Sequence, residues 1–479
     1  MALADQDLKV AIAATRFGLG ARPGEIAAAK RDPQGFLRAQ IRREGADIPA
    51  GVATSSERLG EFREYQLEKR DARLQKAAMA TGADGKPADP DARDPVKVVG
   101  NMLRQDVGAD FGARLQLAVS TEAGFRERWA DFWANHFTVS ATKAITATVI
   151  GPFEAEAIRP NVFGRFADLL GAVETHPAML TYLDQVQSIG PNSRAADVGR
   201  ARLQRVANRT VGLNENLARE ILELHTVGVN GGYSQADVTE FARAMTGLSI
   251  GGPRDPALAA GTAVFRDQAH EPGERMVMGV RYRAAGKDQA GAILADLAAK
   301  PATATFVCSK IARHFVADEP PPALVARLEK AWTASGGDLS RVAEALIAAP
   351  EAWAPTPAKF KTPYEFIVSS YRAAGAHPEN FGKVAPILTA LGQKPFSAPS
   401  PKGWPEDAQS WAAPDAIVKR MQFAQAFSAA AVRDRDPKAL AADALGARLT
   451  PDTAKAVARA ESRAEGFALL LMSPEFQRR

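Results

Sequence analysis

Carboxylate, amide and imidazole side chains are concentrated between residues 211 and 248, VGLNENLAREILELHTVGVNGGYSQADVTEFARAMTGL. Within this stretch, Glu220, Glu223 and His225 follow one another on a predicted helix, and His136 ends an earlier one. Carboxylates and imidazoles can bind a metal ion or transfer protons. We therefore take Glu220, Glu223, His225 and His136 as the candidate catalytic residues.

The same residues also fit a structural role. Glu215, Arg219 and Glu223 recur at four-residue spacing, so they can form a row of ion pairs along one helix face. His225 then serves as a core histidine at the helix end. The spacing Glu-x-x-Glu-x-His is not that of a helix with two zinc-binding histidines. The sequence leaves both interpretations open.

A second polar group follows at His176 and Asp184. His176 precedes Pro177, and a residue before proline leaves the helical conformation. Polar side chains can converge at such a bend, so His176 and Asp184 are the candidate metal ligands. His270, in the turn AHEPGE, is the last of seven residues that could form a hydrolase site: His136, His176, Asp184, Glu220, Glu223, His225 and His270. If these residues form an active site, at least three of them should share one pocket. The sequence leaves the metal and any cofactor undetermined.

Helix signals surround the central stretch. Asn214 can cap a helix that carries the apolar side chains Leu217, Ile221 and Leu222. Ser234 and Asp237 predict a capping box for the next helix. In an earlier helix, one face carries five ring side chains, Trp129, Phe132, Trp133, His136 and Phe137. A stacking platform for a ligand is one use of such a stripe, but a buried core face is the more common one.

These patterns predict a mostly α-helical fold with one small β-hairpin at about 264–283. We divide the chain into an N-terminal helical segment (1–79), a mobile linker (80–95), a central helical core (96–250), a hairpin insertion (251–300) and a C-terminal helical region (301–479). Residues 185–212 are expected to form a basic polar loop. The long loop 393–414 carries Trp404 and Trp411, which predict ordered packing.

Composition restricts the class of protein. The chain has 479 residues with 60 basic and 55 acidic side chains, a balance that does not point to nucleic acid. Its single cysteine, Cys308, permits no intrachain disulfide and is expected to be buried. No run of 18 apolar residues predicts a transmembrane helix. The first residues lack a signal-peptide pattern, so the sequence by itself favours the cytoplasm.

Several motifs together resemble the bacterial domain-of-unknown-function family 1800 over nearly the whole length. They are RFGLGARPGEI, FWANHFTVS, HPAMLTYLD, GLNENLAREILELHTVGVNGGYSQADVTEFARAMTG, AHEPGE, PATATFVCSKIARHFVADEPPP, KFKTPYEF and SPKGWP. The resemblance implies a mostly helical protein of a family that is often exported. It also implies a companion protein that looks like a sulfatase or alkaline phosphatase. It carries over no catalytic residue.

Two functions remain after these exclusions. We expect a scaffold or partner of a sulfatase-like envelope protein, because the chain has no recognised catalytic motif and has long loops. The alternative is a hydrolase, with or without a metal ion, that acts on an anionic ester or polymer through a His/Glu/Asp site.

Overall fold

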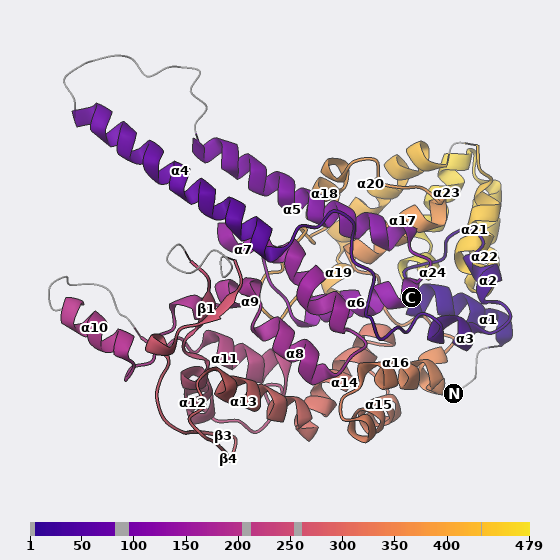
Figure 1. The fold of residues 1–479 in the computed structure, drawn as a ribbon. Coiled ribbons are helices and arrows are strands. Elements are labelled where there is room, and N and C mark those ends of the chain that lie inside the picture. Colours follow the sequence, from indigo (N-terminus) through magenta and orange to yellow (C-terminus); the bar gives the residue numbers. More distant parts are fainter. Residues whose placement is uncertain (1–4, 82–94, 204–211, 253–260, 433) are drawn as a thin grey trace.

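The structure, a computed structural model, describes residues 5–81, 95–203, 212–252, 261–432 and 434–479 (Figure 1). Within these ranges the chain forms 24 α-helices and two antiparallel sheets of two strands each. The expected mostly α-helical fold is therefore confirmed. Buried apolar side chains from Ile12 to Phe476 form one continuous cluster, and Cys308 lies inside it as expected.

Short helices open the described part of the chain: α1 (Gln6–Ile12), α2 (Glu25–Ala29) and α3 (Pro33–Arg38). The carboxylates of Asp5 and Asp32 cap α1 and α3, where they accept backbone N–H groups that the helix leaves unpaired. Phe17, just after α1, places its ring 6.2 Å from that of Phe125. This contact joins the first helices to the centre of the molecule.

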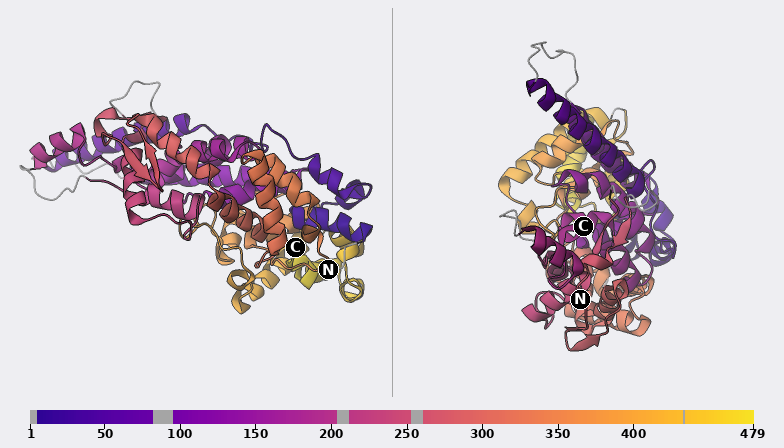
Figure 2. Two further views of the ribbon diagram at one scale, coloured as in Figure 1. Left: turned by 90° about the horizontal axis from the view of Figure 1, so that it is seen from below. Right: turned by 60° about the vertical axis from the view of Figure 1, so that its left-hand side comes forward.

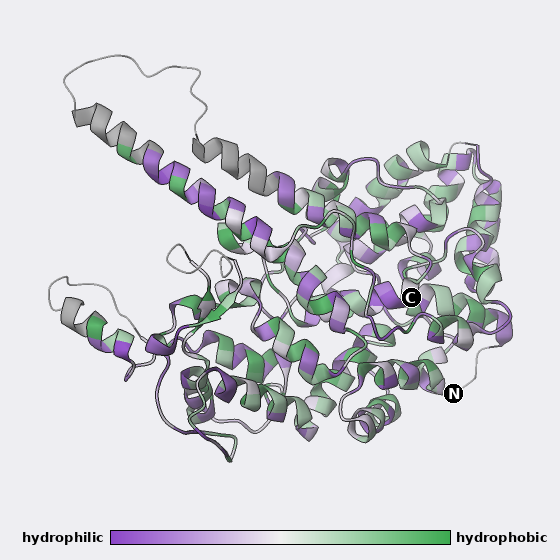
Figure 3. Cartoon of the chain, in the orientation of Figure 1, coloured by the Kyte–Doolittle hydropathy of each residue, from purple (hydrophilic) through white to green (hydrophobic). Residues whose placement is uncertain are grey.

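Two long helices, α4 (Ser55–Thr81) and α5 (Pro95–Ser120), form an arm whose far part projects from the body (Figures 1 and 2). At its base, Arg58 on α4 pairs with Asp106 at 2.6 Å and Asp110 at 3.3 Å on α5. Hydrophilic residues recur along the described part of α4 (Figure 3). Of the linker expected at 80–95, residues 82–94 lie outside the described residues.

The centre contains α6 (Gly124–His136), α7 (Ala144–Phe153), α8 (Phe166–Glu174) and α9 (Pro177–Tyr182). The stripe of five ring side chains comprises four on α6 and Phe137 just after it, and each is at most 1 % exposed. This confirms that the stripe is a buried core face. Trp129 keeps its one polar group satisfied there, since its Nε1–H donates to the carbonyl oxygen of Val162 at 2.7 Å.

The central motif forms α11 (Asn216–Glu220), a π-helical turn η5 (Ile221–His225) and α12 (Gln235–Met245). Asn214 Oδ1 accepts the backbone N–H of Asn216 at 2.9 Å. The expected capping box is present, because Ser234 and Asp237 each accept the other's backbone N–H. These signals depend on neighbouring residues alone, which is why the sequence predicts them.

The strands are β1 (Leu248–Ile250), β2 (Ala263–Phe265), β3 (Arg275–Val277) and β4 (Val280–Tyr282). The expected hairpin exists, but it is β3–β4 alone. Met278 (φ 47°) and Gly279 (φ 79°) form its two-residue turn, and paired positive φ values are what such turns require. The expected turn at Pro272 joins no paired strands, because β2 pairs with β1 instead.

The loop expected at 185–212 is partly helical. It contains the 3₁₀ turn η4 (Gln185–Gln187) and the helix α10 (Arg194–Leu203), while residues 204–211 lie outside the described part. Ser193 precedes α10, and its hydroxyl accepts the backbone N–H of Ala196. The expectation of a continuous loop was wrong because the arginines and alanines of this segment favour a helix once it is capped.

The remaining helices are α13 (Lys287–Ala299), α14 (Pro301–Phe315), α15 (Pro322–Ser335), α16 (Leu339–Ala348), α17 (Pro363–Ala374), α18 (Phe381–Ala390), α19 (Ala408–Trp411), α20 (Pro414–Ala431), α21 (Pro437–Leu445), α22 (Pro451–Arg459), α23 (Arg463–Met472) and α24 (Pro474–Gln477). Seven of them begin with proline, whose missing N–H costs nothing at that position. Among the described helices, none is by itself long and apolar enough to cross a membrane. The pair α13–α14 meets that criterion when taken together, but it bends by 64°.

Candidate functional site

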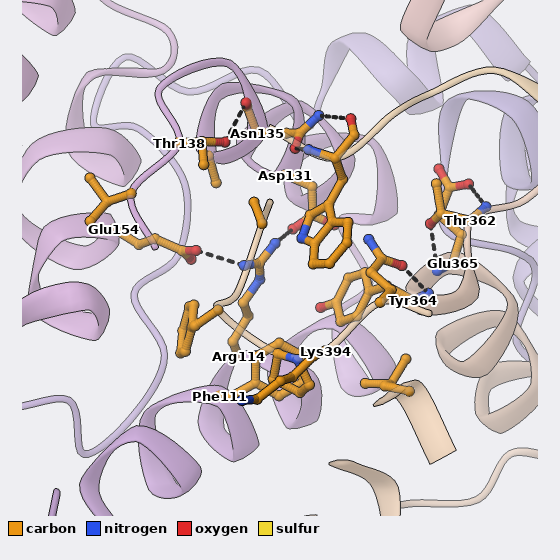
Figure 4. Close-up of a pocket in the computed structure, with 18 of the residues that line it drawn as sticks. Phe111, Arg114, Asp131, Asn135, Thr138, Glu154, Thr362, Tyr364, Glu365 and Lys394 are labelled. Atoms are coloured by element: carbon orange, nitrogen blue, oxygen red, sulfur yellow. Dashed lines mark hydrogen bonds and ion pairs between the residues drawn. The ribbon is translucent and has the colours of Figure 1, made fainter. Parts of the chain in front are cut away.

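A pocket of about 110 Å³ lies where α5, α6, α7, α14 and α17 meet the loop after α18 (Figure 4). We call residues 393–411 the strap; it consists of that loop and the short helix α19 at its end. On the same measure one water needs roughly 10–15 Å³, so the pocket has room for several waters or a small polar molecule. Its lining contains acidic, basic, amide and imidazole side chains.

Helix α6 presents two different faces. Its aromatic face is buried in the core, as described above. Arg128, Asp131 and Asn135 lie at i, i+3 and i+7, so they share the face that lines the pocket. The aromatic face cannot shift without disturbing the core. The buried aromatic face therefore fixes the backbone from which Arg128, Asp131 and Asn135 reach the pocket.

Arg114 of α5 bridges two carboxylates in the pocket (Figure 4). Its guanidinium lies 2.8 Å from Asp131 Oδ1 and 2.6 Å from Glu154 Oε1. The Tyr364 ring lies 5.1 Å from this guanidinium, within reach of a cation–π contact. Within the described residues, Arg114 Nε and the Tyr364 hydroxyl have no hydrogen-bond partner. Both groups are donors that a ligand could use.

Asp131 is poised to exchange a proton near neutral pH. Burial raises the pKa of Asp131 to about 6, and the nearby Arg114 guanidinium offsets only part of this rise. Burial and Asp131 also raise the pKa of Tyr364. A carboxyl group with a pKa near the operating pH can act as a general acid or base.

His314 of α14 and Glu406 of the strap are hydrogen-bonded, with Nδ1 2.5 Å from Oε1. Burial would raise the pKa of Glu406, but His314, Lys359 and Lys310 outweigh burial and lower it to about 2. Burial lowers the pKa of His314 in spite of Glu406. At neutral pH the pair is therefore a carboxylate facing a neutral imidazole.

That state fixes which ring nitrogen carries the proton. A carboxylate can only accept, so Nδ1 of His314 must be the protonated nitrogen. Nε2 is then unprotonated, and in the described part of the chain it has no hydrogen-bond partner. A carboxylate that orients a histidine in this way is half of the arrangement found in hydrolases with a general base.

A third set of charges holds the start of α17. Glu365 accepts hydrogen bonds from Arg128 and from the backbone N–H of Thr362, and Arg479 lies 2.9 Å from it. Burial would raise the pKa of Glu365, but Arg479 and Arg128 hold it well below its usual range. Arg479 also donates to the carbonyl oxygen of His314 at 2.6 Å. This set fixes the backbone around the pocket.

Two of the sequence-predicted residues, His136 and His225, meet in the core, outside this pocket. His136 Nε2 donates to the carbonyl oxygen of His225 at 3.1 Å. His225 Nδ1 lies 2.7 Å from Glu174 Oε1, and both residues are 0 % exposed. That contact lacks the alignment of a hydrogen bond. Burial lowers the pKa of His136, and Lys310 lowers it further.

Glu220 and Glu223 lie half-buried near the surface. Arg219 sits 3.1 Å from Glu215 and 3.8 Å from Glu223, so the ion-pair row predicted for this helix is present. Burial raises the pKa of Glu220. Burial and the hydrogen bond to Glu223 raise the pKa of Tyr233 to about 12. Neither glutamate lines the pocket described above.

His176 caps a helix. Its Nδ1 accepts the backbone N–H of Ala178, so its Nε2 must carry the proton. That one nitrogen faces both Glu156 Oε2 at 2.9 Å and Ser55 Oγ at 3.1 Å. A catalytic triad needs the carboxylate and the hydroxyl on opposite ring nitrogens. The group instead ties the start of α4 to the centre of the fold.

The other expected residues also have structural partners. Asp184 has a positive φ of 58° and pairs with Lys143 at 2.8 Å. His270 Nδ1 lies 2.9 Å from the carbonyl oxygen of Thr246. Across the residues that the structure describes, no three His, Cys, Asp or Glu side chains are grouped to hold a metal ion. None of the seven expected residues lines the pocket beneath the strap.

Sequence reasoning missed the residues that do share one: Arg114, Asp131, His314, Tyr364 and Glu406. One signal was available, because the polar positions of α6 opposite the aromatic stripe include Asp131. The partners of Asp131 come from segments far away in the chain, and no local spacing points to them.

The chain was compared with known proteins. A family model described as "Protein of unknown function (DUF1800)" matches residues 12–478. No curated protein and no solved structure matches the chain. Because the family match spans nearly the whole length, the chain belongs to the DUF1800 family.

Proposed function

We propose that this protein is a hydrolase that acts on a small anionic ester in the pocket beneath the strap. The observation that supports this most is the His314–Glu406 pair, which lines the same pocket as Asp131. One group is a neutral imidazole with a free nitrogen, and the other is a carboxyl group with a pKa of about 6. Perturbed titratable groups that share a cavity are typical of catalytic sites.

The two groups suit opposite proton transfers. His314 Nε2 takes a proton from water, and the water oxygen forms a bond to the electrophilic atom of the ester. Asp131 in its protonated form gives its proton to the leaving oxygen as the ester bond breaks. The proton on His314 then returns to Asp131 through solvent, which restores both groups. Each transfer by a positioned side chain contributes about 10²–10⁴-fold to the rate.

The cations of the pocket favour an anionic substrate. Lys394 lines the pocket, and within the described residues no carboxylate pairs with its ammonium group. Arg114 offers its free Nε, and Tyr364 offers its free hydroxyl. A negative group of the substrate can bind to Lys394 while Arg114 and Tyr364 stabilise the charge that develops on the attacked centre.

The test is hydrolysis of a panel of chromogenic carboxylate, phosphate and sulfate esters by the purified protein. We expect His314→Asn to lower kcat by about 10²–10⁴-fold on the ester that is turned over. His377→Asn is the matched control, because His377 is exposed and lies outside this pocket. Equal kcat values for His314→Asn and the wild type would remove His314 from the mechanism. No turnover of any ester in the panel would favour the second candidate below.

The second candidate is a scaffold or partner of a sulfatase-like companion protein. The arm supports it, since its far part projects from the body (Figure 2). On α4, Leu67 is 40 % exposed and Leu74 is 61 % exposed. They are seven residues apart, so they lie on the same face of the helix. An exposed apolar face on a projecting helix suits a partner helix or groove.

Co-purification with the companion tests this candidate. We expect the double substitution Leu67→Glu and Leu74→Glu to abolish the complex without lowering the unfolding temperature. Val418→Glu on α20 is the control, because Val418 is 50 % exposed on another helix. A complex that tolerates the leucine substitutions would exclude this face of the arm as the docking surface.

A further inference from the structure

We propose that Asn135 is a positioning residue, which holds the strap so that Glu406 orients His314. The inference rests on the proposed function, because it assigns a role within that same site. It also explains two motifs of the sequence together, the FWANHF segment that contains Asn135 and the SPKGWP segment of the strap.

Asn135 binds the strap with both ends of its amide (Figure 4). Its Oδ1 accepts the backbone N–H of Trp404 at 2.7 Å, and its Nδ2 donates to the carbonyl oxygen of Trp404 at 3.1 Å. A side-chain amide is the group that can both accept and donate at one position in this way. An aspartate could only accept, and an apolar residue could do neither.

Gly403 permits this close approach. A Cβ atom at residue 403 would lie 2.5 Å from the carbonyl oxygen of Asn135 and 2.8 Å from Thr138 Oγ1. The φ of Gly403 is +88°, which side chains other than glycine rarely adopt. The strap backbone therefore lies directly on the end of α6, and residue 403 has no room for a side chain.

Glu406 lies between two such attachments. Trp404, two residues before it, is held by Asn135. Ala408, two residues after it, donates its backbone N–H to Asp318 Oδ2 at 2.9 Å. Lys359 donates to the carbonyl oxygen of Glu406 itself. Because the backbone is fixed on both sides, the Glu406 carboxylate stays where it faces His314 Nδ1.

The consequence concerns the imidazole proton. With Glu406 in place, Nδ1 is protonated and Nε2 is free to accept. If the strap leaves α6, His314 loses the acceptor that selects this form. Asn135 itself forms no hydrogen bond with His314 or Glu406, so its effect on the reaction passes through the strap.

The first measurement does not depend on activity. Long-range ¹⁵N–¹H NMR spectra of the full chain report which nitrogen of His314 carries the proton, with His314→Asn identifying its signals. We expect the Nδ1-protonated form in the wild type and a mixture of both forms in Asn135→Ala. Asn161→Ala is the control, because Asn161 is also half-buried and also donates to one backbone carbonyl, that of Ala157.

The second measurement is the kinetics of ester hydrolysis. We expect Asn135→Ala to lower kcat about tenfold or more, with a smaller change in KM, because misplaced catalytic groups lose rate more than binding. Asn135→Asp keeps the acceptor for the Trp404 backbone N–H, so its kcat should lie between those of the wild type and Asn135→Ala. In Gly403→Ala the added methyl group pushes the strap away from α6, so this variant should show the same loss of kcat as Asn135→Ala.

Each outcome separates the two proposals. A wild-type proton position and wild-type kcat in both Asn135→Ala and Gly403→Ala would overturn the positioning role, even if His314→Asn is inactive. A changed proton position without hydrolysis in any variant, the wild type included, would keep the positioning role and overturn the proposed function. If Asn135→Ala does not fold, Asn135→Asp and Gly403→Ala decide by the same readings.

Discussion

Replacing Asp131 with asparagine should stabilise the protein at neutral pH and abolish the proposed hydrolysis. Burial raises the pKa of Asp131 to about 6 from its ordinary value of 3.8, in spite of Arg114. The charged carboxylate is therefore less favourable in the folded state than in the unfolded chain. A residue kept in that state at a stability cost is better explained by function than by folding.

The magnitude follows from the two pKa values. A difference between 3.8 and about 6 corresponds to about 3 kcal/mol, at about 1.36 kcal/mol per pKa unit. The wild type should lose this stability as pH rises from 3.8 through about 6, because its folded state holds the proton longer. Asparagine carries no charge and avoids the loss. Arg114 keeps Glu154 at 2.6 Å, so the substitution leaves no unpaired cation.

Urea unfolding of both proteins between pH 4 and pH 8 measures this difference. We expect the two free energies of unfolding to agree at the acid end and to diverge by about 3 kcal/mol above pH 6. Asp415→Asn, at an exposed position of α20, should change stability by less than about 0.5 kcal/mol. An Asp131→Asn variant that is less stable than the wild type at pH 8 would refute the reasoning, since Asp131 would then stabilise the fold as an ion.

Three further predictions concern groups around the site. Glu406→Gln should destabilise the protein wherever the carboxylate is ionised, since His314, Lys359 and Lys310 lower the pKa of Glu406 from 4.5 to about 2 in the folded state; urea unfolding should show the cost fading as pH drops from 4.5 toward 2, and a pH-independent cost would contradict it. Glu127→Gln should cost about 3–5 kcal/mol by calorimetry, because it leaves the 1 % exposed Arg159 without its two-bond partner, and a loss below about 1 kcal/mol would show that other groups compensate. His176→Ala removes a helix cap and should cost about 1 kcal/mol, speed hydrogen exchange at the start of α4 and leave ester hydrolysis unchanged; lost hydrolysis would place His176 in the mechanism after all.

Local signals in the sequence predicted local structure correctly. The capping box of Ser234 and Asp237 depends on residues three apart, and the buried face of α6 depends on a helical period. The turn of the hairpin was misplaced for a related reason. Pro272 and Gly273 form a strong turn signal, whereas the actual turn begins at Met278, which is an unusual residue for a positive φ.

The site could not be predicted in the same way, because its members are distant in the chain. His314 and Glu406 are 92 residues apart. Arg114 and Asp131 are 17 apart and lie on different helices. Nothing in the spacing of either pair distinguishes it from chance, and only the packing of α5, α6, α14 and the strap brings them together. The stretch 211–248 suggested a site because its polar residues are close in sequence. In the structure, these neighbouring residues cap helices and form a row of ion pairs.

The two-faced helix α6 explains why the pocket forms where it does. A helix whose aromatic side is fully buried has one orientation, so the opposite side must face whatever covers it. Here that cover is the strap, which offers backbone groups at Trp404 and the carboxylate of Glu406. Before α19 the strap forms turns rather than a helix or a strand, so much of its backbone needs partners elsewhere, and Asn135 supplies two. The same contacts that satisfy the strap also place Glu406 beside His314, so the proposed site depends on the contacts that hold the strap against α6.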